Sequence, residues 1–326
     1  MRKILITGAS GFTGKALCRR LIEEGERVVG FVRPTSEIEE LESMGVTCRV
    51  VDITRREEVF RNFDGIGEVV HTAAEYRTEH IDKDAFNQVN VVATEHLLQA
   101  ATAAKVSRFV HLSTVGVQGE IEEPPAGEYY RFKPGDYYQE TKLAGELKAR
   151  EYFSQGLPGA VVRPVGIYGP GDKRFLKLFR SINRGYFVMV GNGMALYHLT
   201  YIDDLIHGII LCLRKHEALG RVFTIAGERY TTILELVNTI AEVLGKPHPK
   251  VRIPFYPVYG SALVFDKMLR TAGIKSPLYP RRFDFFYKDR AFCISKANRL
   301  LGYRPSVGLR EGLEKTASWY KQENLL

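Results

Sequence analysis

The stretch "TGASGFTG", residues 7–14, follows the first apolar run of the chain and opens a helical segment. Within it Gly8, Gly11 and Gly14 stand in the pattern G-x-x-G-x-x-G. Glycines let a chain turn sharply and let its backbone approach a phosphate, whose charge then lies on the N-terminus of the helix. Directly after a strand, the pattern predicts a loop that binds the pyrophosphate of a dinucleotide.

The run that ends at Thr7 is the first of six similar short runs. They are rich in β-branched residues, they lack polar alternation, and helical stretches such as 15–25 and 89–104 separate them. Strands of this kind indicate an α/β fold with a parallel sheet buried on both faces. Right-handed crossovers then make the sheet doubly wound. The predicted strands span residues 3–7, 27–32, 48–53, 68–73, 108–113 and 160–165.

After about residue 170 the regular alternation loosens, and helical patterns mix with Pro-rich connections. We therefore predict a dinucleotide-binding domain at residues 1–169, to which residues 196–226 return. Residues 170–195 and 227–326 are predicted to form a smaller, irregular C-terminal lobe that binds the substrate.

Composition narrows the class of protein. The chain has 326 residues, of which 45% are hydrophobic, so it can bury a sizeable core. Its formal net charge of +8 comes from basic residues interleaved with acids, which disfavours nucleic acid and favours an anionic cofactor or small-molecule substrate. The four cysteines lack metal-ligand spacing, so we expect no metal and reduced thiols in a cytoplasmic protein.

Neither a signal peptide nor a transmembrane segment is expected. The N-terminus runs straight into the first predicted strand. The apolar stretch at residues 253–265 is broken by Pro257 and Gly260 and is too short to span a bilayer.

The segment after the second predicted strand bears on the choice of cofactor. An acidic residue there would hydrogen-bond the ribose hydroxyls of NAD and repel a 2′-phosphate. Here Val32 closes the strand and Arg33 follows, with Thr35 and Ser36 as hydrogen-bond donors. Because a guanidinium suits a phosphate monoester, the sequence favours NADP(H), with NAD(H) as the alternative.

The pattern Tyr-x-x-x-Lys occurs twice, at Tyr129–Lys133 and at Tyr138–Lys142. Two residues four apart share one face of a helix. Lys133 precedes Pro134, which disfavours helical geometry there, whereas Tyr138 begins a run of good helix formers. The second pair is therefore the candidate.

Tyr137 is a neighbour that must be told apart from Tyr138, and it lies about 100° further around the helix. An ammonium near Tyr138 would stabilise its phenolate, so that the phenol can exchange a proton with a substrate oxygen near neutral pH. Ser113 and Thr114 end the fifth predicted strand, at the edge where ligands bind in open α/β sheets. A hydroxyl there can hydrogen-bond the same substrate oxygen.

Together these motifs resemble the extended short-chain dehydrogenases/reductases, or NAD-dependent epimerase/dehydratase family, over nearly the whole chain. "TGASGFTG" is similar to the family's phosphate loop. "LSTVGVQG" (residues 112–119) is similar to its catalytic strand, with Thr114 at the catalytic position and Ser113 behind it, and "YQETK" (residues 138–142) to its Tyr-x-x-x-Lys motif. The resemblance implies a Rossmann fold, an NAD(P)-dependent enzyme with the catalytic set Thr114, Tyr138 and Lys142, and a homodimer formed by helices within residues 86–104 and 137–153. The expected cofactor contacts are Gly8, Gly11, Phe12, Thr13, Gly14, Arg33, Asp52, Ile53, Ala73, Ala74, Asn90, Ser113, Tyr138, Lys142, Pro164 and Val165.

The chain departs from the family's nucleotide-sugar members at three points. Gly166 stands where they commonly carry an asparagine, and Tyr197 stands about where an arginine clamps the substrate pyrophosphate. Val115 and Gly116 replace the Asp-Glu pair of the 4,6-dehydratases, which argues against that dehydration. The basic residues that we consider as substitutes for the arginine are Lys173, Arg174, Lys177, Arg281, Arg282 and Arg290.

Three functions remain open. The first, narrowly favoured, is a nucleotide-sugar epimerase or keto-reductase that works by Tyr-assisted hydride transfer. The second is an NADP-dependent dehydrogenase or reductase of a hydrophobic alcohol or ketone, similar to the 3β-hydroxysteroid dehydrogenase and dihydroflavonol reductase branches. Aromatic residues at positions 256, 259, 285 and 286 suit this second function. The third is a non-catalytic NADP-binding sensor, against which the intact Thr-Tyr-Lys set argues.

Overall fold

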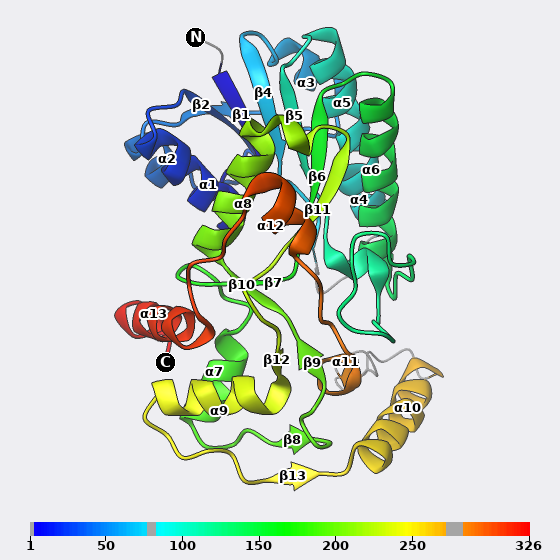
Figure 1. Cartoon of the computed structure of the whole chain (residues 1–326), viewed down its shortest axis with the longest axis vertical. Helices are drawn as coiled ribbons and strands as arrows, with labels where there is room; N and C mark the ends of the chain where they lie inside the picture. Colours follow the sequence, from blue (N-terminus) through cyan, green and yellow to red (C-terminus); the bar gives the residue numbers. More distant parts are fainter. Residues whose placement is uncertain (1–2, 77–82, 272–282) are drawn as a thin grey trace.

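The computed structural model describes residues 3–76, 83–271 and 283–326 of the chain. Its centre is a sheet of seven parallel strands in the order β11-β6-β5-β4-β1-β2-β3, drawn in the upper half of Figure 1. The order reverses at β1, which lies between β2 and β4, and this is the arrangement expected of a doubly wound fold. The strands are β1 (Lys3–Thr7), β2 (Val28–Val32), β3 (Thr47–Val50), β4 (Ile66–His71), β5 (Arg108–Leu112), β6 (Gly159–Pro164) and β11 (Arg221–Ile225).

Helices cover both faces of this sheet (Figure 1). Successive residues of a strand point to opposite faces. Ile4 and Ile6 of β1 therefore join the core under α1 and α8, whereas Leu5 joins the core under α3, α5 and α6. The predicted doubly wound α/β fold is confirmed. The flanking helices are α1 (Phe12–Glu23), α2 (Glu39–Ser43), α3 (Arg56–Arg61), α4 (Lys83–Asn87), α5 (Ala93–Ala103), α6 (Tyr137–Ser154) and α8 (Ile202–Arg214).

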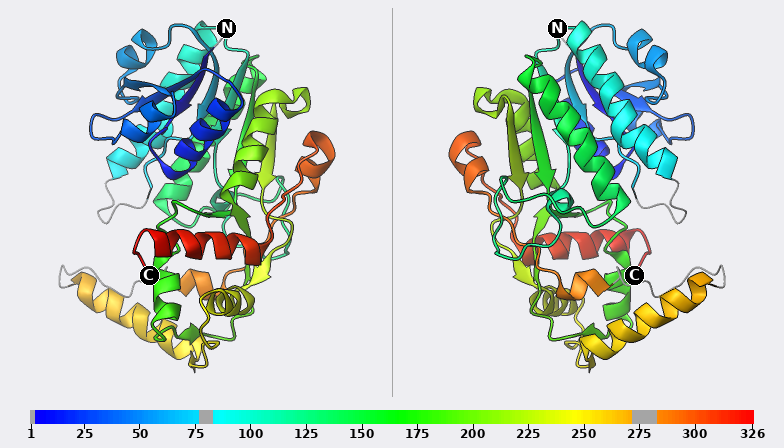
Figure 2. Two further views of the ribbon diagram at one scale, coloured as in Figure 1. Left: turned by 90° about the vertical axis from the view of Figure 1, so that its left-hand side faces the viewer. Right: turned by 90° about the vertical axis from the view of Figure 1, so that its right-hand side faces the viewer.

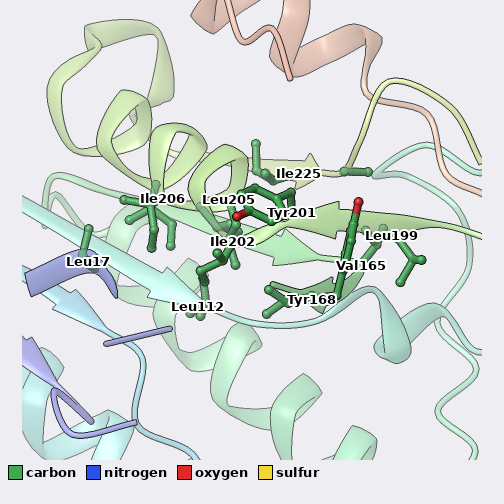
Figure 3. Close-up of a cluster of buried hydrophobic side chains, with 14 of the residues drawn as sticks. Leu17, Leu112, Val165, Tyr168, Leu199, Tyr201, Ile202, Leu205, Ile206 and Ile225 are labelled. Carbon is green, nitrogen blue, oxygen red and sulfur yellow. The ribbon is translucent and has the colours of Figure 1, made fainter. Parts of the chain in front are cut away.

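Apolar packing under α8 fixes the carboxyl ends of the central strands. Figure 3 shows Leu205 of α8 among side chains that include Leu112 at the end of β5, Val165 after β6 and Ile225 at the end of β11. All four are buried. Burying a side chain of this kind contributes roughly 1.5–3 kcal/mol, so these strand ends are held in place from one side of the sheet.

The chain below the sheet forms a lobe of helices and very short strands (Figures 1 and 2). The short strands pair two by two, β7 with β10, β8 with β13 and β9 with β12. The elements of this part are β7 (Gly166–Tyr168), α7 (Leu176–Asn183), β8 (Met189–Val190), β9 (Leu196–Tyr197), β10 (Leu199–Tyr201), β12 (Thr231–Thr232), α9 (Ile233–Val243), β13 (Arg252–Ile253), α10 (Phe255–Thr271), α11 (Asp284–Tyr287) and α13 (Leu309–Gln322). Between α11 and α13 the chain returns to the sheet as α12 (Ser295–Leu301).

The structure corrects one expectation in this lobe. Residues 255–265 of the apolar stretch that Pro257 and Gly260 were expected to break belong to one continuous helix, α10. Pro257 lies in the first turn of that helix, where the backbone N–H groups have no acceptor within the helix, so the missing N–H of proline costs little. Within residues 3–76, 83–271 and 283–326, no helix is long and apolar enough to cross a membrane.

Two further features were not expected from local patterns. β11 adds a seventh strand beside β6, and η1 (Gln88–Val92) is a π-helical segment that leads into α5. The domain boundaries stay a prediction. α12, from a segment assigned to the lobe, packs against β11 and α8 on the sheet side.

Candidate active site

A cavity of about 1140 Å³ lies between the carboxyl ends of the sheet strands and the lobe. Its sheet-side wall comes from the segments that follow β1, β4, β5 and β6 and from the start of α6. The predicted site residues that line it are Gly8, Gly11, Phe12, Thr13, Gly14, Ala74, Ser113, Thr114, Tyr138, Lys142, Pro164 and Val165. The predicted residues that lie beyond its lining are Arg33, Asp52, Ile53, Ala73 and Asn90.

The glycine loop after β1 is closed to any larger side chain. Gly8 has a φ of +68°, and a Cβ there would lie 2.9 Å from the Cα of Ala73. A Cβ on Gly14 would lie 2.1 Å from the carbonyl oxygen of Gly8. The N-cap of α1 is Gly11, which has no side chain to occupy the helix N-terminus. The loop therefore leaves room and free backbone donors for a diphosphate, and the residues present fit a dinucleotide.

Asn90 is buried outside the cavity lining and connects two parts of the cavity wall by hydrogen bonds. Its side-chain oxygen accepts a hydrogen bond from the Glu75 N–H (2.8 Å), and its amide nitrogen donates to the Glu75 carbonyl (3.2 Å) and to Thr141 Oγ1 (3.0 Å). The amide thus ties the Ala74–Tyr76 wall of the cavity to α6. Ala73 is held nearby, since its N–H donates to Thr7 Oγ1 at 3.3 Å.

The predicted adenosine end of the site lies at the carboxyl ends of β2 and β3. The Arg33 side chain is exposed, and no ion pair joins it to the part of the chain that the structure describes. Ser36 Oγ accepts hydrogen bonds from the Arg33 N–H and from Ser10 Oγ, both at 3.1 Å, which links this loop to the glycine loop. Asp52 turns its carboxylate to Thr54, with oxygen–oxygen distance 2.6 Å, and Ile53 follows it against the core.

The two hydroxyl residues after β5 point to different places. Thr114 is half-buried at the cavity, and its Oγ1 accepts the Gly116 N–H at 3.1 Å. Ser113 is buried, and its Oγ donates to a carboxylate oxygen of Glu146 at 2.7 Å. The Thr114 hydroxyl hydrogen therefore remains available to a ligand, whereas that of Ser113 is used within the protein.

Helix α6 presents Tyr138 and Lys142 to the cavity. Its N-cap is Asp136, whose carboxylate accepts the Gln139 N–H at 2.9 Å. The ring of Tyr138 packs edge-on against Tyr76, with centroids 4.9 Å apart. Lys142 is buried, and its Nζ donates to the carbonyl of Leu112 at 2.6 Å. Burial lowers the pKa of Lys142 to about 8, while Glu146 opposes that shift.

The neighbouring tyrosines lie elsewhere. The ring of Tyr137 contacts Phe86, which also touches Tyr138, and the Lys83 ammonium lies 5.4 Å from the centre of the Tyr137 ring. Tyr129 is 91% exposed. Of these two and Tyr138, Tyr138 alone lines the described cavity.

The lobe-side wall of the cavity is aromatic. Its rings contact one another in a chain, with centroid separations of 6.4, 5.3, 5.2 and 6.4 Å. This aromatic wall consists, in order of contact, of Phe175, Tyr197, Phe285, Phe286 and Phe187. Sequence reasoning singled out the two phenylalanines of α11, and Tyr197 as the replacement of an arginine, but missed Phe175 and Phe187. Tyr256 and Tyr259, named with them, lie beyond the cavity lining.

Two of the sequence departures meet within this wall. A Cβ on Gly166 would lie 3.1 Å from the hydroxyl oxygen of Tyr197. Tyr197 and Leu199, whose Cδ2 would lie 3.0 Å from that Cβ, therefore occupy the space that a longer side chain at position 166 would need, and the two departures are neighbours.

The basic residues near the cavity differ in their pairing. Arg174 is paired with Asp172 at 2.5 Å, and Arg290 lies 3.8 Å from Asp284. Lys173 and Lys177 are exposed at the cavity, and among the described residues no carboxylate pairs with them. Arg281 and Arg282 lie outside the described residues.

His198 is a buried cavity residue that sequence reasoning missed. Its Nδ1 accepts the Phe292 N–H at 3.4 Å, so its Nε2 donates to the Gly227 carbonyl at 3.0 Å. Burial lowers its pKa to about 4. The imidazole is therefore neutral and joins two lobe segments. No local pattern in the sequence predicts these backbone partners.

Comparison with known proteins identifies the family of this chain. The sequence profile of the NAD dependent epimerase/dehydratase family matches residues 4–226. A 3 beta-hydroxysteroid dehydrogenase/Delta 5-->4-isomerase of Mycobacterium tuberculosis is 31% identical, over 98% of this chain and 90% of that protein. A 2-alkyl-3-oxoalkanoate reductase of Stenotrophomonas maltophilia is 29% identical, over 96% of this chain and 98% of that protein.

Among solved structures, a UDP-glucuronic acid 4-epimerase from Bacillus cereus in complex with NAD matches with a TM-score of 0.78. It is 27% identical and covers 98% of this chain and 99% of that chain. The family resemblance read from the motifs is confirmed. The chain belongs to the NAD dependent epimerase/dehydratase family and is an oxidoreductase-type enzyme of the extended short-chain dehydrogenase/reductase class.

Proposed function

We propose that this enzyme is an NAD(P)-dependent dehydrogenase or reductase of a secondary alcohol or ketone carried on a hydrophobic body. The observation that carries this choice is the aromatic wall, which faces the same cavity as Thr114 and Tyr138. An apolar substrate gains most from burial against such rings. The sterol and oxoalkanoate relatives, named after their substrates, support the same class.

In the proposed mechanism the phenol of Tyr138 gives its proton to the carbonyl oxygen during reduction and takes it back during oxidation. Thr114 donates a hydrogen bond to that oxygen. The Lys142 ammonium, held by the Leu112 carbonyl, stabilises the phenolate that remains. A nicotinamide cofactor bound along the glycine loop would supply or accept the hydride.

NADP(H) is the cofactor we propose, with Arg33 and Ser36 on the 2′-phosphate. The Ser10–Ser36 hydrogen bond supports this assignment, because it brings the Arg33 loop beside the loop that would hold the diphosphate. The relative with a bound cofactor contains NAD, so the preference has to be measured on this chain.

A second candidate, the nucleotide-sugar epimerase or keto-reductase, is favoured by Lys173 and Lys177. Their ammonium groups at the cavity would suit the phosphates of a UDP-sugar, but equally a carboxylate on a hydrophobic substrate. For this second candidate the substrate would be anionic. The sensor hypothesis would require that no substrate turns over.

A substrate panel separates the candidates. A 3β-hydroxysteroid, a 2-alkyl-3-oxoalkanoate and UDP-glucuronic acid are each offered with NADP(H) and with NAD(H). Nicotinamide absorbance follows the redox reactions, and chromatography of the sugar detects epimerisation, which leaves no net change in cofactor. Turnover of a hydrophobic substrate is expected; turnover of the sugar alone would overturn the proposal.

We also propose a homodimer through the outer surfaces of α5 and α6, which lie side by side on one face of the sheet (Figure 2). Leu147 of α6 is 46% exposed there. Sedimentation at micromolar concentration is expected to give a dimer, and Leu147→Glu is expected to shift it toward monomer. A strict monomer in the unaltered protein would remove this proposal.

A further inference from the structure

Glu146 lies one helical turn after Lys142 on α6 and is completely buried. Its carboxylate accepts hydrogen bonds from Ser113 Oγ at 2.7 Å and from Arg163 Nε and Nη2 at 2.9 and 2.5 Å. A single carboxylate thus joins the helix that carries Tyr138 to the strand ends of β5 and β6.

Arg163 is the largest completely buried side chain of the described structure. Its third contact is from Nη1 to the Glu128 carbonyl at 2.9 Å. The Glu128 carboxylate in turn accepts the Thr224 N–H of β11 at 2.9 Å. Because burying a pair of charges costs more free energy than packing apolar groups of the same shape, stability alone does not explain this pair.

The groups that face Lys142 come from three sides. From α6 come Tyr138 and Glu146, and Arg163 of β6 lies behind that carboxylate. From β4 and β5 come His71 and His111, whose rings are 5.3 Å apart. Burial and then Lys142 lower the pKa of both histidines, to about 3 for His71, so they are neutral at neutral pH.

We propose that Glu146 and Arg163 are positioning residues of this site. Their hydrogen bonds hold Ser113 and the following Thr114 against α6, and the balance of their opposite charges decides how readily Lys142 loses its proton. This inference rests on the proposed function of Lys142 as the cation beside Tyr138. Removing the carboxylate leaves a second buried cation near Lys142, whereas removing the Arg163 guanidinium leaves Glu146 with Arg150 as its cation, whose Nη1 lies 3.7 Å from the carboxylate.

The two halves of the pair are therefore expected to act in opposite directions. In Glu146→Gln, the pH at which Lys142 loses its proton falls by about one unit or more. In Arg163→Gln it rises. Arg163→Lys keeps the positive charge, so Lys142 is expected to lose its proton at nearly the same pH as in the unaltered protein. In the double variant Glu146→Gln/Arg163→Gln, that pH is expected to return toward the value of the unaltered protein. The matched control is Glu151→Gln, an exposed glutamate of the same helix, which is expected to change nothing.

Two readouts test this. Lysine Nζ titration by NMR, with the Lys142 signal assigned by its loss in Lys142→Met, reports the charge without substrate. The alkaline limb of kcat/KM against pH reports its effect on turnover. Opposite NMR shifts support the inference, and equal or absent shifts overturn it. If the NMR shifts are opposite but the alkaline limb of kcat/KM stays at the same pH, the pair does control the charge of Lys142. In that case the proposed role of Lys142 in turnover is contradicted. If the Arg163 variants do not fold, the Lys142 titration of Glu146→Gln is compared with that of Glu151→Gln. A purely structural Glu146 would leave the pH at which Lys142 loses its proton unchanged.

Discussion

The two walls of the cavity are built differently. The sheet-side wall stands on strands of five or six residues whose ends are packed from both faces. The lobe-side wall stands on strands of two residues, on the four-residue helix α11 and on aromatic rings that contact one another. Long strand pairings place the polar groups of the first wall, whereas packing between rings on short elements places much of the second. We infer that the sheet fixes the chemistry and that the lobe chooses the substrate.

The largest expected effect is on the sheet side. Tyr138→Phe is expected to lower kcat by about a hundred- to ten-thousandfold, because only the transferable proton is removed. Cofactor affinity, measured by fluorescence titration, is expected to stay nearly unchanged. Tyr137→Phe and Tyr129→Phe are the controls, and equal inactivation by either would show that the wrong tyrosine has been chosen.

The lobe-side counterpart is Tyr197→Ala. Losing the ring from the aromatic wall is expected to lower kcat/KM for a hydrophobic substrate about ten- to a hundredfold, the value of one buried aromatic side chain. Cofactor affinity is not expected to change. Tyr256→Ala, which removes a ring that is 85% exposed on α10, is the matched control. A loss of cofactor binding in Tyr197→Ala would contradict the division of labour between the walls.

Arg33→Ala examines the predicted adenosine end of the cofactor site, which lies after β2 and beyond the cavity lining. A charge-assisted phosphate contact contributes about 1.5–3 kcal/mol, and at this exposed position we expect the lower end, roughly a tenfold loss in NADPH affinity. NADH affinity is expected to stay the same. Arg61→Ala on α3 is a control at another exposed arginine. Equal affinities for NADPH and NADH in the unaltered protein would mean that Arg33 is only solvated.

The smallest expected effect is on the pH dependence of stability. It concerns one buried histidine from each side of the cavity, His71 of β4 and His198 of the lobe. Their folded pKa values, about 3 and about 4, lie below the usual 6.5. The unfolded chain therefore binds the protons first, and stability is lost as pH falls below 6.5. Between pH 6.5 and 5.5 each is expected to cost about 1 kcal/mol.

Urea unfolding at these two pH values tests the comparison. His71→Asn and His198→Asn are each expected to reduce the loss of unfolding free energy between these two pH values by the contribution of one histidine. If His198→Asn leaves the pH dependence unchanged, the lobe does not unfold together with the sheet.

Much of the fold and part of the site followed from short-range patterns. Six strands and the glycine loop were found because each is defined by residues within a few positions of one another. Tyr138 could be told from Tyr137 because adjacent helical residues point about 100° apart. β11 was missed as a strand, since its membership of the sheet depends on pairing with β6, some sixty positions earlier by chain order.

By itself, then, the sequence determined the parallel sheet, the glycine loop and the spacing of Tyr138 and Lys142. These depend on backbone conformation and helical periodicity, which neighbouring residues control. Only the tertiary structure decided that Tyr197 fills the space above Gly166, that Phe175 and Phe285 share one wall, and that Glu146 joins Ser113 to Arg163. Each of those contacts joins residues from separate elements, and burial and packing between elements leave no periodic signal along the chain.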